Sequence, residues 1–95
     1  MKLTLPEVVA LNQAVTQRYG GVHGIRDKAG LAAALHRPFH TFEGVFLHAD
    51  TFHQGAALLE GLVIAHPFWD GNKRTGYTAT RLFLFRHGYH VRAYQ

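Results

Sequence analysis

Residues 66–76 carry most of the side chains in this sequence that could perform chemistry. The segment reads His-Pro-Phe-Trp-Asp-Gly-Asn-Lys-Arg-Thr-Gly, which combines a possible base, a carboxylate and two adjacent cations. A site that handles the phosphates of a nucleotide needs these groups. The spacing therefore predicts an anion-binding site, although it does not by itself name a reaction.

Two side chains in this segment have specific predicted roles. His66 is the candidate general base, because histidine at its ordinary pKa accepts a proton near neutral pH. Asp70 follows four residues later in an irregular stretch, where its carboxylate could hold a Mg²⁺ ion that bridges phosphate oxygens. We expect Phe68 to point inward and anchor the turn between them.

The residues after Asp70 are the candidate phosphate-binding group. The amides at the start of a helix have no partners within it, so they, the helix dipole and two cationic side chains could converge on one anion. Each residue alone also has an ordinary structural explanation, in a turn or in solvent, and only the combination favours the anion site. The group comprises Gly71, Asn72, Lys73, Arg74 and Thr75.

Length and composition limit the class of protein. A chain of 95 residues indicates a single domain, residues 1–95, and 47% apolar residues can supply its core. The absence of cysteine excludes a disulfide scaffold and a cysteine nucleophile. Without a signal-like or membrane-spanning stretch, we expect a soluble, cytoplasmic protein that does not bind membranes. The net charge of +4 favours anionic partners of any kind.

Four helices are predicted to position the segment, and the last of them is apolar over most of its circumference, as a central helix should be. Their ends follow from capping residues and from glycine or proline. The predicted limits are Thr4 and Gly20 for the first helix, Asp27 and Pro38 for the second, Asp50 or Thr51 and Ala65 for the third, and Asn72, as the cap, and Gly88 for the fourth.

Residues 38–46 are aromatic and β-branched without a helical period, which predicts an exposed loop or a short hairpin. The alternative is an irregular loop whose Phe39, Phe42 and Phe46 cover the core. Residues 89–94 alternate weakly and could be extended. The fold class is therefore a compact, all-α domain with a central motif-bearing helix.

Two other functions are disfavoured by the sequence. His36 and His40 have i, i+4 spacing, but Pro38 between them should keep them off a common helical face, so a zinc site is not expected. The arginines within residues 81–92 lack a recognised DNA-binding motif, and no direct binding of nucleic acid is expected.

The segment resembles the signature of the Fic/Doc family. That signature reads H-P-F-x-[DE]-G-N-G-R-x-x-R in the Fic branch and H-x-F-x-[DN]-[AG]-N-K-R-T in the Doc, or death-on-curing, branch, and residues 66–75 satisfy the second throughout. Lys73 stands where Fic proteins have a glycine, and Tyr77 stands where they have a second arginine. Residues 18–27 and the short helix that leads to Pro38 also look like the family's lead-in.

The resemblance implies a toxin of a toxin–antitoxin pair. Fic enzymes transfer AMP from ATP to a protein hydroxyl, whereas the Doc branch is implied to reverse the nucleotide and to phosphorylate a threonine of elongation factor Tu, which arrests growth. His66 would then activate the hydroxyl, Asp70 would hold Mg²⁺, and residues 72–74 would bind the phosphates of ATP. AMP transfer and a non-catalytic module that binds an anion or a partner remain alternatives.

The resemblance also implies two protein contacts. A cognate antitoxin would fold its disordered tail onto a groove lined by the first two helices. A hairpin flap at residues 38–46 would align the target chain by strand addition. Doc-like chains continue further in helices, so we expect this one to be C-terminally short.

Overall fold

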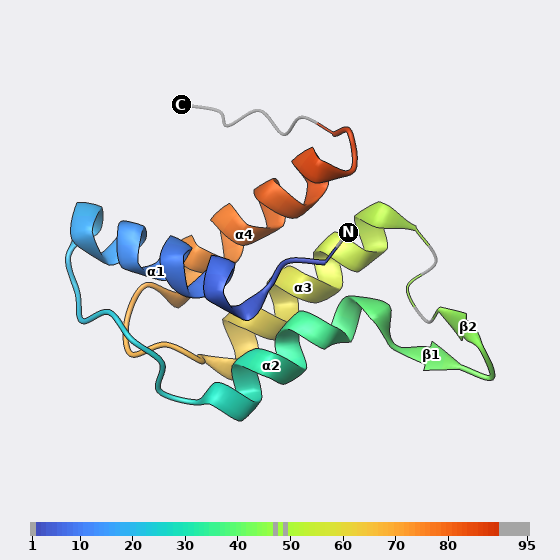
Figure 1. Ribbon diagram of the computed structural model, residues 1–95, viewed down its shortest axis with the longest axis horizontal. Coiled ribbons are helices and arrows are strands. Elements are labelled where there is room, and N and C mark those ends of the chain that lie inside the picture. The colour runs from blue at the N-terminus through green and yellow to red at the C-terminus, as the bar shows by residue number, and fades with distance from the viewer. Residues whose placement is uncertain (1, 47, 49, 90–95) are drawn as a thin grey trace.

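The computed structural model describes residues 2–46, 48 and 50–89, and it confirms the all-α fold. α3 and α4 pack together at the centre, with α1 against α4 and α2 against α3 (Figure 1). Within the described ranges, no helix is both long and apolar enough to cross a membrane. The elements are α1 (Leu5–Tyr19), α2 (Lys28–His36), the 3₁₀ helix η1 (Arg37–Phe39), β1 (Thr41–Phe42), β2 (Val45–Phe46), α3 (Thr51–Ala65) and α4 (Asn72–Arg86).

The first three helices begin at side chains that satisfy their free amides. Thr4 and Glu7 form the predicted capping box, in which the Thr4 amide donates to Glu7 Oε1 at 2.9 Å and the Glu7 amide donates to Thr4 Oγ1 at 3.3 Å. Asp27 and Asp50 each accept from the amide three residues later, at 2.9 and 2.8 Å. Asp50, rather than Thr51, is therefore the cap of α3.

The two ends of α4 depend on glycine. The prediction that Asn72 caps this helix was wrong, because Gly71 is the cap, in the left-handed conformation with φ of 75°, and Asn72 is the first helical residue. At the other end Gly88 has φ of 87°, and its amide donates to the Phe85 carbonyl at 3.0 Å. The amide of Tyr89 donates to the Leu84 carbonyl at 3.0 Å, which completes a Schellman motif and confirms Gly88 as the predicted stop.

The core lies between the helices α1, α2, α3 and α4, with Val8 of α1, Leu31 of α2, Leu62 of α3 and Phe83 of α4 fully buried. Phe68 is 1% exposed and anchors the motif turn, as predicted. Gly61 lets α3 approach α2 closely, because a Cβ at this position would lie 3.3 Å from the Cα and Cβ of Ala34. One side of α4 is less buried than its apolar sequence predicts, since Tyr77 and Phe85 remain 44% and 58% exposed.

Residues 41–46 form the predicted hairpin, in which Thr41 pairs with Phe46 and Phe42 with Val45. Its two turn residues have positive φ, 53° at Glu43 and 80° at Gly44, as a type I′ hairpin turn requires. Phe42 and Phe46 are at least half exposed, so the alternative in which they cover the core was wrong. Phe39 does pack inward, edge to face against Phe83 with ring centroids 6.1 Å apart.

The hairpin lies at the end of the molecule opposite to the motif. α2 and α3 run antiparallel (Figure 1). The start of α2 and the end of α3 both lie beside Pro67, and the hairpin connects the other ends of the two helices. The 15 residues of α3 span about 22 Å. A target strand added to this hairpin would therefore lie about one helix length from His66, which does not favour the strand-addition role that the family resemblance implies.

The expectation that Pro38 keeps His36 and His40 apart was wrong. The rings of His36 and His40 meet edge to face at 5.0 Å, contrary to the expectation, because η1 continues the helical path of α2 through Pro38. Among the described residues, no group of three or more His, Cys, Asp or Glu side chains could hold a metal ion. The predicted extended segment at residues 89–94 lies, except for its first residue, outside the described residues.

Candidate active site

The motif loop between α3 and α4 is held by the loop between α1 and α2, which crosses it. Ile25 and Phe68 form an isolated antiparallel bridge. The Pro67 carbonyl accepts hydrogen bonds from the amides of Arg26 and Asp27, at 2.7 and 3.0 Å. Residues some forty positions apart in the sequence therefore fix the backbone on which the predicted base lies.

His66 is exposed and is the C-cap of α3, in the left-handed conformation with φ of 48° and ψ of 55°. Its Nδ1 lies 3.2 Å from the Ile64 carbonyl oxygen. Because a carbonyl only accepts, this contact requires a proton on Nδ1, so that in the neutral imidazole Nε2 is the acceptor. A general base needs its imidazole in this form.

A pocket of about 360 Å³ opens beside His66. It brings together all of the predicted site residues except Thr75, which is 1% exposed and contributes its hydroxyl to the interior instead. Trp69, for which the sequence predicted no role, also lines the pocket and is 58% exposed. The lining residues are His66, Trp69, Asp70, Gly71, Asn72, Lys73 and Arg74.

Asp70 is oriented by the crossing loop. Its Oδ2 accepts a hydrogen bond of 2.7 Å from the Val22 amide. Gly21 permits this approach, because a Cβ at that position would lie 2.8 Å from Asp70 Cβ and the backbone φ there is 110°. No described residue donates to Oδ1. One oriented and exposed carboxylate oxygen fits Mg²⁺, which typically binds through one or two carboxylates and the phosphates of its nucleotide.

The side chain of Asn72 is used within the turn. Its Oδ1 accepts from the Phe68 amide and its Nδ2 donates to the Phe68 carbonyl, both at 2.9 Å. This pair of bonds closes the loop between the two helices. A contribution of Asn72 to phosphate binding would therefore come from its backbone amide at the start of α4, whose first amides are free of intrahelical partners.

The two cations of the motif differ in their surroundings. The guanidinium of Arg74 lies 3.9 Å from the centroid of the Tyr19 ring, a cation–π contact that holds it beside the pocket. Lys73 lines both this pocket and an adjoining apolar one of about 470 Å³ on the exposed face of α3 and α4. Tyr77 lines only the apolar one. The positive charge of the pocket therefore comes from residues 73 and 74.

Asn12 is a buried residue whose side chain supports the motif loop, and it was not predicted from the sequence. It is 1% exposed on α1, and its Nδ2 donates to the Asp70 carbonyl at 2.9 Å and to Thr75 Oγ1 at 3.2 Å. Its Oδ1 accepts from the Gly24 amide at 3.3 Å. A signal was present, because Asn12 follows the buried Val8 by one helical turn and a polar side chain on a core face requires partners.

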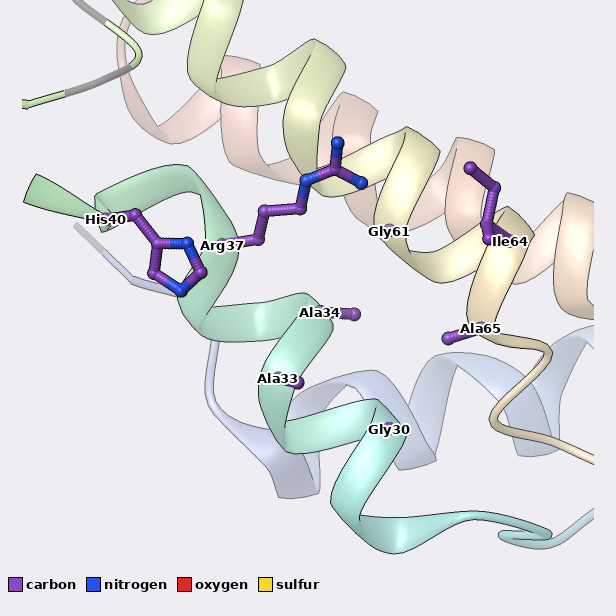
Figure 2. A pocket seen from close by; sticks show the side chains of 8 residues that line it. All are labelled: Gly30, Ala33, Ala34, Arg37, His40, Gly61, Ile64 and Ala65. Atoms are coloured by element: carbon purple, nitrogen blue, oxygen red, sulfur yellow. The ribbon is translucent and has the colours of Figure 1, made fainter.

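A second pocket, of about 270 Å³ between α2 and α3, contains none of the motif residues (Figure 2). Figure 2 shows small side chains along both helices, with Arg37 and His40 near the hairpin end and Ala65 near the motif end. It offers no carboxylate, and its guanidinium is paired with Glu60. The chemistry of the described residues is therefore concentrated in the motif pocket.

Comparison with known proteins agrees with this geometry. The sequence matches the model of the Fic/DOC family over residues 2–84. It is 39% identical over 75 residues to "Toxin Doc" of Mycolicibacterium smegmatis, covering 79% of this chain and 58% of that protein. It is 34% identical over 87 residues to "Protein kinase doc" of Escherichia phage P1, covering 90% and 67%. No solved structure gives a significant match.

The protein belongs to the Fic/DOC family, and these two relatives agree with its assignment to the Doc branch. The chain spans 58% of the length of the mycobacterial relative and 67% of that of the phage relative. The family is the one that residues 66–75 indicated in the sequence.

Proposed function

We propose that this protein is a Doc-type toxin that transfers the γ-phosphate of ATP to a hydroxyl group of a protein. One observation carries the proposal: a single pocket holds an exposed histidine with a free acceptor nitrogen, an oriented carboxylate and two cations at a helix start. The names of its two relatives, a toxin and a protein kinase, agree with this activity.

Each group in the pocket has a role in the proposed reaction. Nε2 of His66 takes the proton of the acceptor hydroxyl as the hydroxyl oxygen attacks the γ-phosphorus. The bond from that phosphorus to the β–γ bridging oxygen breaks, and ADP leaves. Lys73, Arg74 and the first amides of α4 neutralise the phosphate oxygens. Asp70 would hold Mg²⁺, which when bound supplies further positive charge to the phosphates. Phosphoryl transfer depends mainly on positioning and charge neutralisation, and this pocket supplies both.

The departures from the Fic pattern favour phosphate transfer over AMP transfer. A Fic enzyme uses a second arginine where this chain has Tyr77, and the tyrosine lines the neighbouring apolar pocket. Lys73 adds a cation where Fic proteins have glycine. Positive charge is thus concentrated at the first turn of α4, close to His66, where a transferred γ-phosphate would lie.

A protein is the proposed acceptor, and a threonine of elongation factor Tu in the cytoplasm is the specific candidate. Trp69 and Val22 are 58% and 62% exposed beside the pocket. Exposed aromatic residues of this kind are enriched where proteins bind each other.

The proposed antitoxin tail has a suitable groove of about 240 Å³ between the start of α1 and α2, lined by Lys2, Leu3, Leu5, Ala32, Leu35 and His36.

Labelled nucleotides test the reaction. The protein is incubated with elongation factor Tu, Mg²⁺ and ATP labelled at either the γ- or the α-phosphate. We expect transfer of the γ label only, its loss in His66→Ala, and its retention in His53→Ala, which alters an exposed histidine at the far end of α3. Transfer of the α label would establish AMP transfer instead. Growth arrest that persists in His66→Ala without any label transfer would support a non-catalytic binding module.

A further inference from the structure

The side chain of Arg26 closes the end of α3 that carries His66. Although Arg26 is exposed, its Nε donates to the His66 carbonyl at 2.8 Å, and its Nη2 donates to the same oxygen at 2.6 Å and to the Ala65 carbonyl at 3.0 Å. Its own amide donates to the Pro67 carbonyl at 2.7 Å. One residue of the crossing loop thus binds three consecutive carbonyls around the histidine.

These bonds are placed where the backbone needs support. The last carbonyls of a helix lack intrahelical partners and lie at the negative end of its dipole, so a cation there is favourable. His66 also has φ of 48°, a conformation that few residues other than glycine adopt. The guanidinium contacts both carbonyls that flank this strained position.

The shape of the guanidinium matters as well as its charge. Its planar fork presents several N–H groups in fixed directions, and here two nitrogens reach two consecutive carbonyls. The ammonium of lysine is a compact point charge and cannot reproduce this arrangement. Since the backbone of His66 sets the direction of its side chain, the same bonds fix the imidazole over the pocket.

We propose that Arg26 is a positioning residue for His66: its guanidinium holds the end of α3 in the left-handed conformation that directs Nε2 of the histidine toward the acceptor hydroxyl. This inference rests on the proposed function for its effect on turnover. Its effect on the conformation of His66 does not depend on any activity. The two effects can therefore be tested separately.

The kinetic test compares Arg26→Ala, Arg26→Lys and the control Arg37→Gln, which removes a guanidinium at the far end of α2. We expect kcat to fall roughly 10-fold to 100-fold in both Arg26 variants, since a misplaced catalytic group costs rates of this order, with KM for ATP unchanged. Added guanidinium ion at low concentration should restore part of the kcat of Arg26→Ala and none of that of His66→Ala. An unchanged kcat in both Arg26 variants would overturn the proposal.

The structural test follows the HN–Hα coupling and the ¹³Cα and ¹³Cβ shifts of His66 by NMR. Both Arg26 variants should move these signals away from left-handed values, whereas Arg37→Gln should leave them in place. Wild-type signals in both variants would overturn the proposal, whatever the kinetics show. A wild-type protein that transfers no phosphate would refute the proposed function, and the NMR comparison would still decide whether Arg26 positions His66.

Discussion

Gly21 and Gly20 are adjacent glycines with positive φ, yet only one of them contacts the site. A Cβ at Gly21 would meet Asp70 at 2.8 Å, whereas a Cβ at Gly20 would have no neighbour within 4 Å. A comparison of alanine substitutions at the two positions therefore distinguishes the effect of backbone strain from the effect of displacing the Asp70 carboxylate.

Replacing Gly21 by alanine should lower phosphate transfer more than replacing Gly20. Both variants incur the strain of a side chain at positive φ, on the order of 1–3 kcal/mol. Only Gly21→Ala also displaces Asp70, so its kcat/KM for ATP–Mg²⁺ should fall at least about tenfold below that of Gly20→Ala, or about 1.4 kcal/mol. Equal activity of the two variants would show that the carboxylate has no fixed position to lose.

A substitution of Asn12 tests whether its hydrogen bonds stabilise the motif loop. Asn12→Ala leaves the Gly24 amide and the Asp70 carbonyl without their partner, and each unsatisfied buried group costs about 1–3 kcal/mol. Because both bonds are only part-buried, the free energy of unfolding, measured in urea, should drop by about 2–4 kcal/mol, the lower part of the sum of two such losses. Gln13→Ala, one position away on the exposed side of α1, should change it by less than about 0.5 kcal/mol. Similar losses in both variants would contradict this role.

At the scale of elements, the start of α1 is joined to the end of α4 by an ion pair between Glu7 and Arg86. The hydrogen bond from Arg86, followed by that from the Thr4 amide, lowers the pKa of Glu7 from 4.5 to about 2. A carboxyl whose pKa is lowered by folding stabilises the folded state above its unfolded pKa and loses that contribution as the pH falls toward its folded pKa.

The ion pair between Glu7 and Arg86 therefore predicts that the stability of the folded state falls as the pH is lowered. Glu7→Gln keeps a capping-box side chain but removes the charge. The variant should be less stable than wild type at pH 7, and the difference in melting temperature should shrink between about pH 4.5 and pH 2. A difference that stays constant across this range, followed by circular dichroism, would assign the effect to packing rather than to ionisation.

The sequence predicts those features of the helices that depend on residues close to one another in the chain. The caps at Thr4, Asp27 and Asp50 and the stop at Gly88 were predicted correctly, because their signals lie within a few residues of each helix end. The positioning bonds of Asn12 and of the crossing loop were not predicted. They join residues 12–26 to residues 65–75, and no local pattern encodes which segments meet.

The same limit explains the errors about individual side chains. Asn72 is of a residue type that often caps helices, yet its side-chain amide closes the turn by bonding to the backbone of Phe68. The hairpin was predicted from its residue types, but its separation from His66 follows from the antiparallel packing of α2 on α3. Family resemblance indicated the residues of the site, whereas the structure shows what holds them.

At the scale of the whole molecule, ligand binding should appear as added stability. A ligand that binds only the folded state raises its stability by RT ln(1 + [L]/Kd), about 2.7 kcal/mol at a hundredfold excess over Kd. ATP with Mg²⁺ should therefore raise the melting temperature more than ATP with a chelator does. In Asp70→Asn, which can still accept from the Val22 amide, the gain from Mg²⁺ should be lost. A full Mg²⁺ effect in that variant would show that another residue binds the ion.

The crossing of the two loops has a consequence for the order of folding. The bonds that orient Asp70 and His66 join positions 40 to 48 residues apart, as between Arg26 and His66 or between Val22 and Asp70. Contacts of such sequence separation form only after the loop-closure entropy of the intervening chain has been overcome. α3 can form its own turns earlier, but its terminal histidine acquires its direction only when the first loop closes over it. In a newly made chain, catalytic competence should therefore arise only after the loop between α1 and α2 has closed over the motif.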